Sequence, residues 1–129
     1  MAELVVDGTT RQGVLMLRLV GAPSPEEMQL FVRLHNQAVD AFRDKHYRVF
    51  CDIRELLPLS PEAADLFEQA KAYSASRPNF QGSSVLTSSS VVAMQHRRTS
   101  MNSGVLSTEL LSDDEAACWA HLARIQRSR

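Results

Sequence analysis

The fold is decided by one stretch of the chain, Arg48-Val-Phe-Cys-Asp-Ile-Arg-Glu-Leu-Leu-Pro-Leu-Ser-Pro61. Its apolar run from Val49 to Ile53 is nearly unbroken, which is typical of a strand covered on both faces. A short loop follows, and Ser60 then stands directly before Pro61, an arrangement that begins many helices. A buried strand that leads into a helix predicts a central sheet with helices packed on it. It also predicts a functional rim at the C-terminal end of that strand.

Strand and helix patterns alternate along the rest of the chain. Capping boxes at residues 24–27 and 112–115 begin the first and last predicted helices, and three serines precede the third. The predicted strands are residues 3–7, 14–20, the central strand, 84–87 and 105–111; the predicted helices are residues 25–45, 60–76, 91–102 and the helix after the second capping box. The order is ββαβαβαβα. It predicts the α/β class: a single domain over residues 1–129, with a mixed sheet of about five strands and four helices.

The composition indicates an ordinary soluble globular protein. Of its 129 residues, 44% are hydrophobic and 22% are charged, and the net charge of -1 gives no overall field that would draw the chain to nucleic acid. The N-terminus lacks the basic flank and apolar core of a signal peptide, and we expect no membrane span. The two cysteines, Cys51 and Cys118, fall in predicted buried elements and make no disulfide framework. We therefore expect a reduced, cytoplasmic protein.

The sequence contains no recognisable pattern for catalysis or metal binding. Its histidines lack the close spacing of a metal site: His35, His46, His96 and His121. Cys51 lies in an apolar strand, where a thiol is inert, and there is no Gly-x-Ser-x-Gly elbow or Gly-rich phosphate loop. We therefore expect no enzyme, no cofactor and no metal.

A run of three serines, Ser88, Ser89 and Ser90, is the main polar pattern that remains. It precedes the third helix, so free backbone N–H groups and several hydroxyls could bind an anion there. The alternative is that one serine caps the helix and the other two are solvated. In the helix that follows, Val91, Met94 and Arg98 share one face.

Three segments resemble the anti-sigma-factor-antagonist (STAS) family, and more narrowly its SpoIIAA-like bacterial members. These segments are the exit D-I-R-E-L of the central strand with the following S-P-E-A-A-D-L-F, the turn V-L-T-S-S-S-V-V-A-M-Q-H-R-R, and the terminal S-D-D-E-A-A-C-W-A-H-L. Together they cover roughly residues 45–123. The resemblance implies a STAS-like sandwich and a non-catalytic bacterial regulatory domain that binds a partner protein, either another protein or a second copy of itself.

The chain departs from the family at the loop after the central strand. Regulatory members carry a phosphorylatable serine there, but this chain reads Asp52-Ile-Arg-Glu55, and Ser60 is better explained as a helix cap. We therefore expect no phosphorylation switch of the usual kind. The same loop places three leucines beside charged residues, which predicts a partner-binding surface. Its candidate residues are Asp52, Arg54, Glu55, Leu57 and Leu59.

A second function stays open: a carrier of a lipid or small apolar ligand, as in the CRAL-TRIO proteins with which similar sequences are sometimes grouped. A continuous apolar cavity of a few hundred cubic ångströms between sheet and helices would favour the carrier. A solid core with an exposed apolar patch near Leu56, Leu57 and Leu59 would favour protein binding.

Overall fold

The computed structural model describes residues 2–104 and 108–127, and its element order is ββαβαβαβα, as predicted. The strands are β1 (Glu3–Asp7), β2 (Val14–Val20), β3 (Tyr47–Asp52), β4 (Phe80–Leu86) and β5 (Glu109–Ser112). The helices are α1 (Pro25–Ala41), α2 (Pro61–Ala75), α3 (Ser90–Ser103) and α4 (Glu115–Arg127). The α/β class and the mixed five-stranded sheet are therefore confirmed.

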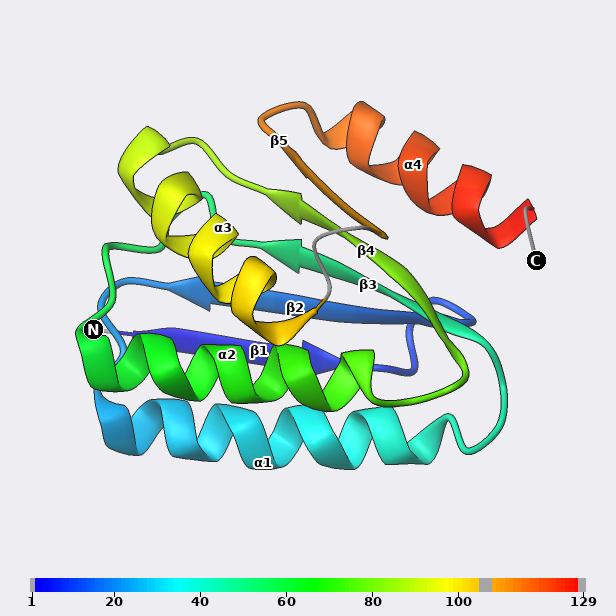
Figure 1. The fold of residues 1–129 in the computed structure, drawn as a ribbon, viewed down its shortest axis with the longest axis horizontal. Helices are drawn as coiled ribbons and strands as arrows, with labels where there is room; N and C mark the ends of the chain where they lie inside the picture. The colour runs from blue at the N-terminus through cyan, green and yellow to red at the C-terminus, as the bar shows by residue number, and fades with distance from the viewer. Residues whose placement is uncertain (1, 105–107, 128–129) are drawn as a thin grey trace.

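The five strands lie side by side in the same order as in the sequence (Figure 1). β1 pairs antiparallel with β2, because a short turn joins them, and each later pair is parallel because a helix makes the return. The C-terminal ends of β2 to β5 therefore share one edge of the sheet, and their N-terminal ends share the opposite edge.

Two apolar cores lie on opposite faces of the sheet. In β3, Val49 and Cys51 face the larger core, which includes residues of α1, α2 and α3, whereas Phe50 faces the smaller core under α4. Alternate side chains of a strand point to opposite faces, so a strand buried on both faces needs the unbroken apolar run that the sequence shows.

The helix starts follow the capping pattern of the sequence, with one exception. Ser24 makes the full capping box of α1, and the hydroxyl of Ser60 accepts from the Ala63 N–H at the start of α2. The exception is α4, where Asp114 Oδ1 accepts from the Ala116 N–H at 3.0 Å. The predicted box that begins at Ser112 is therefore wrong, because Ser112 belongs to β5.

Two element boundaries also differ from the prediction. The first helix ends at Ala41 rather than near residue 45, and Arg43 takes a left-handed backbone conformation in the loop that follows. β4 begins at Phe80, four residues before the predicted start, because its polar first half is covered on both faces. A β-carbon at Gly82 would lie 2.9 Å from the backbone oxygen of Thr108 and 2.8 Å from Ile125 Cδ1, so the backbone at Thr108 leaves no room for a larger residue. The predicted last strand begins at 105, and residues 105–107 lie outside the described residues.

Candidate functional site

Charged side chains at the C-terminal rim of the sheet pair with one another. Arg54 makes a two-point contact with Asp52, at 2.9 and 3.1 Å, just beyond the end of β3. Burial opposes ionisation of Asp52, but the hydrogen bonds and charge of Arg54 outweigh it and lower the pKa of this carboxyl. Arg18 of β2 pairs with Glu55 and also reaches Glu3. The loop after β3 therefore carries a partly exposed, internally paired charge network.

The three leucines of this loop have different surroundings. Leu56 and Leu59 are buried in the larger core, with only 4% and 8% of their surface exposed, whereas Leu57 is 56% exposed. Leu59 is held inward by Gln95 of α3, whose side-chain amide bonds both the N–H and the C=O of Leu59 at 2.8 Å. The prediction that Leu59 is a surface residue was therefore wrong, and Leu57 is the leucine that this loop exposes.

Two of the three serines at the start of α3 make hydrogen bonds within the protein. Ser89 caps the helix by accepting from the Val92 N–H, and Ser88 donates to the backbone oxygen of Arg54 at 2.9 Å. Ser90 is the first residue of the helix and is exposed. An anion-binding role for these serines stays a prediction.

α3 turns its polar side toward the protein interior. Its buried residues are Val92, His96, Thr99 and Ser100. The opposite side exposes Val91, Met94 and Met101, which are 60%, 74% and 62% exposed. These three residues and Arg98 recur at helical spacing, so they form one outer stripe. Apart from Val92, the buried side of α3 is thus polar, whereas the buried side of an ordinary surface helix is apolar.

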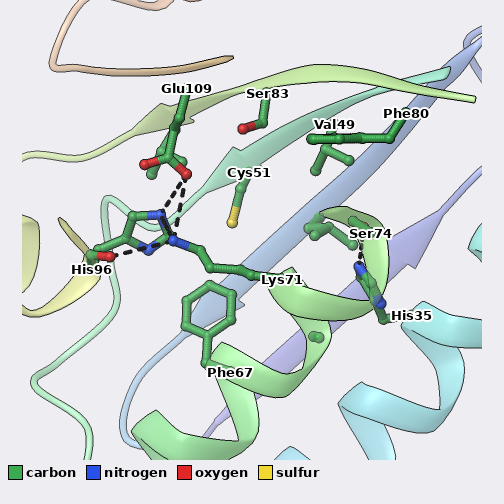
Figure 2. Close-up of a pocket in the computed structure, with 13 residues that line it drawn as sticks. His35, Val49, Cys51, Phe67, Lys71, Ser74, Phe80, Ser83, His96 and Glu109 are labelled. Carbon is green, nitrogen blue, oxygen red and sulfur yellow. Dashed lines mark hydrogen bonds and ion pairs between the residues drawn. The ribbon is translucent and has the colours of Figure 1, made fainter. Parts of the chain in front are cut away.

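The polar side of α3 meets a buried polar cluster, which we define as Lys71, His96, Ser100 and Glu109 (Figure 2). Lys71 extends from α2 and contacts His96 Nε2, Ser100 Oγ and Glu109 Oε2, the last at 3.4 Å. Ser100 Oγ in turn donates to Glu109 Oε1 at 2.7 Å. The cluster therefore joins α2, α3 and β5 inside the fold.

The buried polar cluster holds one positive and one negative charge at neutral pH. Burial lowers the pKa of Lys71 to about 8, so the amine still carries its proton. Burial and the Lys71 charge lower the pKa of His96 to about 4, so the imidazole is neutral. Burial alone would raise the pKa of Glu109, but its contacts with His96, Lys71 and Ser100 hold it at about 2. The charges compensate each other, as burial requires.

A small cavity lies between the sheet and the helices beside this cluster. Its volume is about 30 Å³, and Figure 2 shows the Cys51 thiol pointing toward the Lys71 side chain along it. Two buried polar atoms of its lining residues, Ser83 Oγ and His96 Nδ1, have no hydrogen-bond partner among the described residues. This space holds about one or two water molecules. It does not reach the few hundred cubic ångströms that would favour a lipid carrier.

Sequence reasoning did not find the buried polar cluster, although a pattern for it exists. In α2, Phe67, Ala70, Lys71 and Ser74 recur at the spacing of one helix face, which places a lysine on an apolar face. In α3, His96 and Ser100 are four residues apart and therefore neighbours. Their partner Glu109 comes from a different element, and sequence spacing alone could not join the three.

Residues 2–104 and 108–127 contain no group of three or more histidine, cysteine, aspartate or glutamate side chains arranged to hold a metal ion. None of their helices combines the length and the apolar character needed to span a membrane.

The fold and its rim define a class, the α/β sandwich of SpoIIAA-like type. A solved structure of an uncharacterized protein of the DUF3478 family from Shewanella loihica PV-4, which has a SpoIIAA-like fold, is similar to this chain with a TM-score of 0.66. The two share 14% sequence identity over 92% of this chain and 91% of that chain. No family model matches the sequence, and no curated protein matches it. At this identity the likeness shows the fold, and it confirms the SpoIIAA-like resemblance at that level.

Proposed function

We propose that this protein is a non-catalytic interaction domain that binds a partner protein through α3 and the loop after β3. The main support for this proposal is the orientation of α3, which exposes Val91, Met94 and Met101 while it buries His96 and Ser100. Exposed apolar side chains that gather on one helix face mark interaction sites more often than single ones do. Methionine is enriched in interfaces and adapts its shape to different partners.

The loop after β3 adds to the same surface. Ser88, just before α3, bonds the backbone of Arg54, and Gln95 of α3 bonds the backbone of Leu59, so the loop is attached at the start of α3 and to its first half. It contributes the exposed Leu57 and the charged Asp52, Arg54 and Glu55. An apolar centre with a polar border is the usual composition of a protein interface.

Buried contacts also hold this surface in place. The buried polar cluster fixes α3 from below through Lys71 and Glu109, and two hydrogen bonds of 2.8 Å fix Leu59 to Gln95. A surface that is already ordered loses little conformational entropy when a partner binds. Because residues 52–55 contain no hydroxyl, a phosphate on this loop is not expected to control binding.

The test is a comparison of Met94→Glu and Leu57→Asp with the wild type, using affinity purification with mass spectrometry for partners and sedimentation for self-association. Both changes should remove the partner or the self-association while the thermal unfolding midpoint stays within a few degrees. The matched control is Leu30→Glu on α1, which is also an exposed leucine, 40% accessible. Association that survives Met94→Glu and Leu57→Asp but is lost in Leu30→Glu would place the interface on α1 and overturn the proposal.

A further inference from the structure

A groove lies at the edge of the sheet opposite the rim, where β2, β3 and β4 begin. It consists of two adjoining hollows of about 670 and 430 Å³ that share Gln12, Arg48 and Gln126. This size is that of a small-molecule site. The larger hollow is also lined by Gly13, Phe42, Lys45, His46 and Gln81, and the smaller by Arg11, Val14, Trp119 and Ala123.

The groove has a strongly positive lining. Arg11, Lys45 and Arg48 contribute permanent positive charges and His46 a further basic group, whereas none of the described lining residues is acidic. The whole chain has a net charge of -1, so this lining is unlike the rest of the surface. A cleft lined by one sign of charge concentrates ions of the opposite sign.

Arg48 is the central residue of this lining. It is 8% exposed, and its Nη1 donates to the backbone oxygen of Leu122 at 3.0 Å. Within residues 2–104 and 108–127 it forms no ion pair with a carboxylate. A guanidinium has five N–H donors, and a buried charge is normally paired. Arg48 therefore has donors available to an anion in the groove.

Gln81 provides a second, independent indication of a ligand. It is 6% exposed, and its side-chain amide makes no hydrogen bond with any residue that the structure describes, so the polar atoms of this amide stay accessible from the groove. Its position is irregular, because Tyr47 pairs with Phe80 while the next residue, Arg48, pairs with Gly82. Gln81 is thus the extra residue of a β-bulge, a feature that often redirects a side chain toward a functional site.

We infer that this groove binds a small molecule through an oxyanion, either a phosphate or a carboxylate group. Arg48 and Gln81 are its buried donors, and Lys45 and Arg11 add charge at its exposed margin. Hydrogen bonds from charged donors to phosphate or carboxylate are the strong ones, which suits a solvent-open site. The inference is independent of the α3 surface, which lies elsewhere on the fold.

The experiment follows ¹H–¹⁵N amide shifts of the full chain during titration with pyrophosphate, inorganic phosphate or succinate at constant ionic strength, with chloride as the reference salt. Saturable shifts at Gly13, Arg48 and Gln81 are expected for phosphate, carboxylate or both, and the comparison identifies which oxyanion source the groove takes. Shifts that do not saturate, or that chloride reproduces, would show general screening and overturn the inference.

Variants assign the binding to these side chains. Lys45→Gln and Gln81→Leu should weaken binding by roughly threefold to tenfold. Arg97→Gln is the matched control, because it removes one exposed positive charge on α3 and should leave binding unchanged. Arg48→Gln should abolish binding, and if it fails to fold, the Lys45 and Gln81 variants still decide. Equal affinity of Lys45→Gln, Gln81→Leu and wild type would contradict the assignment.

Discussion

Lys71 of α2 and Glu109 of β5 form an ion pair inside the protein, with 3.4 Å between Nζ and Oε2, although 38 residues separate them in the sequence. Their side chains are only 10% and 2% exposed. The pair lies under α3, and both members also contact Ser100. It therefore determines which side of α3 faces inward, and so which side chains the helix exposes.

Removal of one member of the Lys71–Glu109 pair should lower the free energy of unfolding much more than removal of both charges. Lys71→Met leaves the Glu109 carboxylate buried without its cation, so the free energy of unfolding should fall by roughly 3–5 kcal/mol. Lys71→Met combined with Glu109→Gln removes both charges and should recover much of that loss. Urea unfolding measures each value. Lys45→Met, at an exposed lysine, is the control. If Lys71→Met costs no more than the control, the pair does not stabilise the fold.

Stability should fall as the pH drops from about 6.5 to 4. In the unfolded chain His96 gains a proton near pH 6.5, whereas in the folded protein burial and the Lys71 charge lower its pKa to about 4. Between these values the unfolded state binds more protons, so acid favours unfolding. Burial also lowers the pKa of His35, which adds to the same trend. For His96, the change from 6.5 to about 4 corresponds to a loss of roughly 3 kcal/mol.

Urea unfolding at several pH values tests this trend. His96→Gln keeps an acceptor for Lys71 but cannot titrate, so its stability should depend less on pH across that window. Below about pH 4.5 a second loss is expected, because Glu109 has a folded pKa of about 2 and its contribution disappears as the pH falls toward that value. An equally steep dependence in His96→Gln would show that other groups control acid unfolding.

The parts of the fold that the sequence predicted correctly depend on local patterns. β3 is an apolar run buried on both faces, and α1 and α2 begin with a capping serine followed by a proline. The predicted strand at residues 84–87 starts four residues too late, because Gln81 to Ser83 are polar or small, a pattern typical of a loop. They are buried because α4 packs over them, and Ser84 bonds the Cys118 oxygen at 2.8 Å. That partner lies 34 residues away, beyond any local pattern.

The candidate site was less predictable because it depends on which side of a helix faces inward. α3 has Val91 and two methionines on its exposed side, and His96 and Ser100 together with Val92 on its buried side. By hydrophobicity alone the first side would be buried. The observed orientation follows from Lys71 and Glu109, which supply charged partners from two other elements. Sequence spacing can show which side of its own helix each residue lies on, but not which residues of different elements come into contact.

The leucines of the loop after β3 should respond differently to the same substitution. Leu57→Asp places a charge at a position that is 56% exposed, so stability should change by less than about 0.5 kcal/mol. Leu59→Asp places a charge in the larger core, so the free energy of unfolding should fall by roughly 3 kcal/mol or more. Urea unfolding of the two variants measures this difference. Similar small costs for both would mean that Leu59 is not buried.

The last prediction concerns the two thiols, which lie on opposite faces of the sheet. Cys51 belongs to the larger core and Cys118 to the smaller one, and both are unpaired. Burial raises the pKa of Cys51 to about 12 and that of Cys118 to about 11, so neither forms a reactive thiolate near neutral pH. Each should react with an aromatic disulfide reagent only when the protein opens.

The rates of labelling show whether the reagent reaches each cysteine only after the protein unfolds or already in the native state. If both thiols react only after the same cooperative unfolding, their labelling rates should be similar. In Lys71→Met both rates should rise by the factor that corresponds to the decrease in the free energy of unfolding. The reason is that Cys51 and Cys118 share no core and have only unfolding in common. Urea at low concentration should accelerate both in the same proportion. Rapid reaction of Cys51 in the native protein, with Cys118 still slow, would show that the cavity beside Lys71 opens independently of unfolding and that this thiol is accessible.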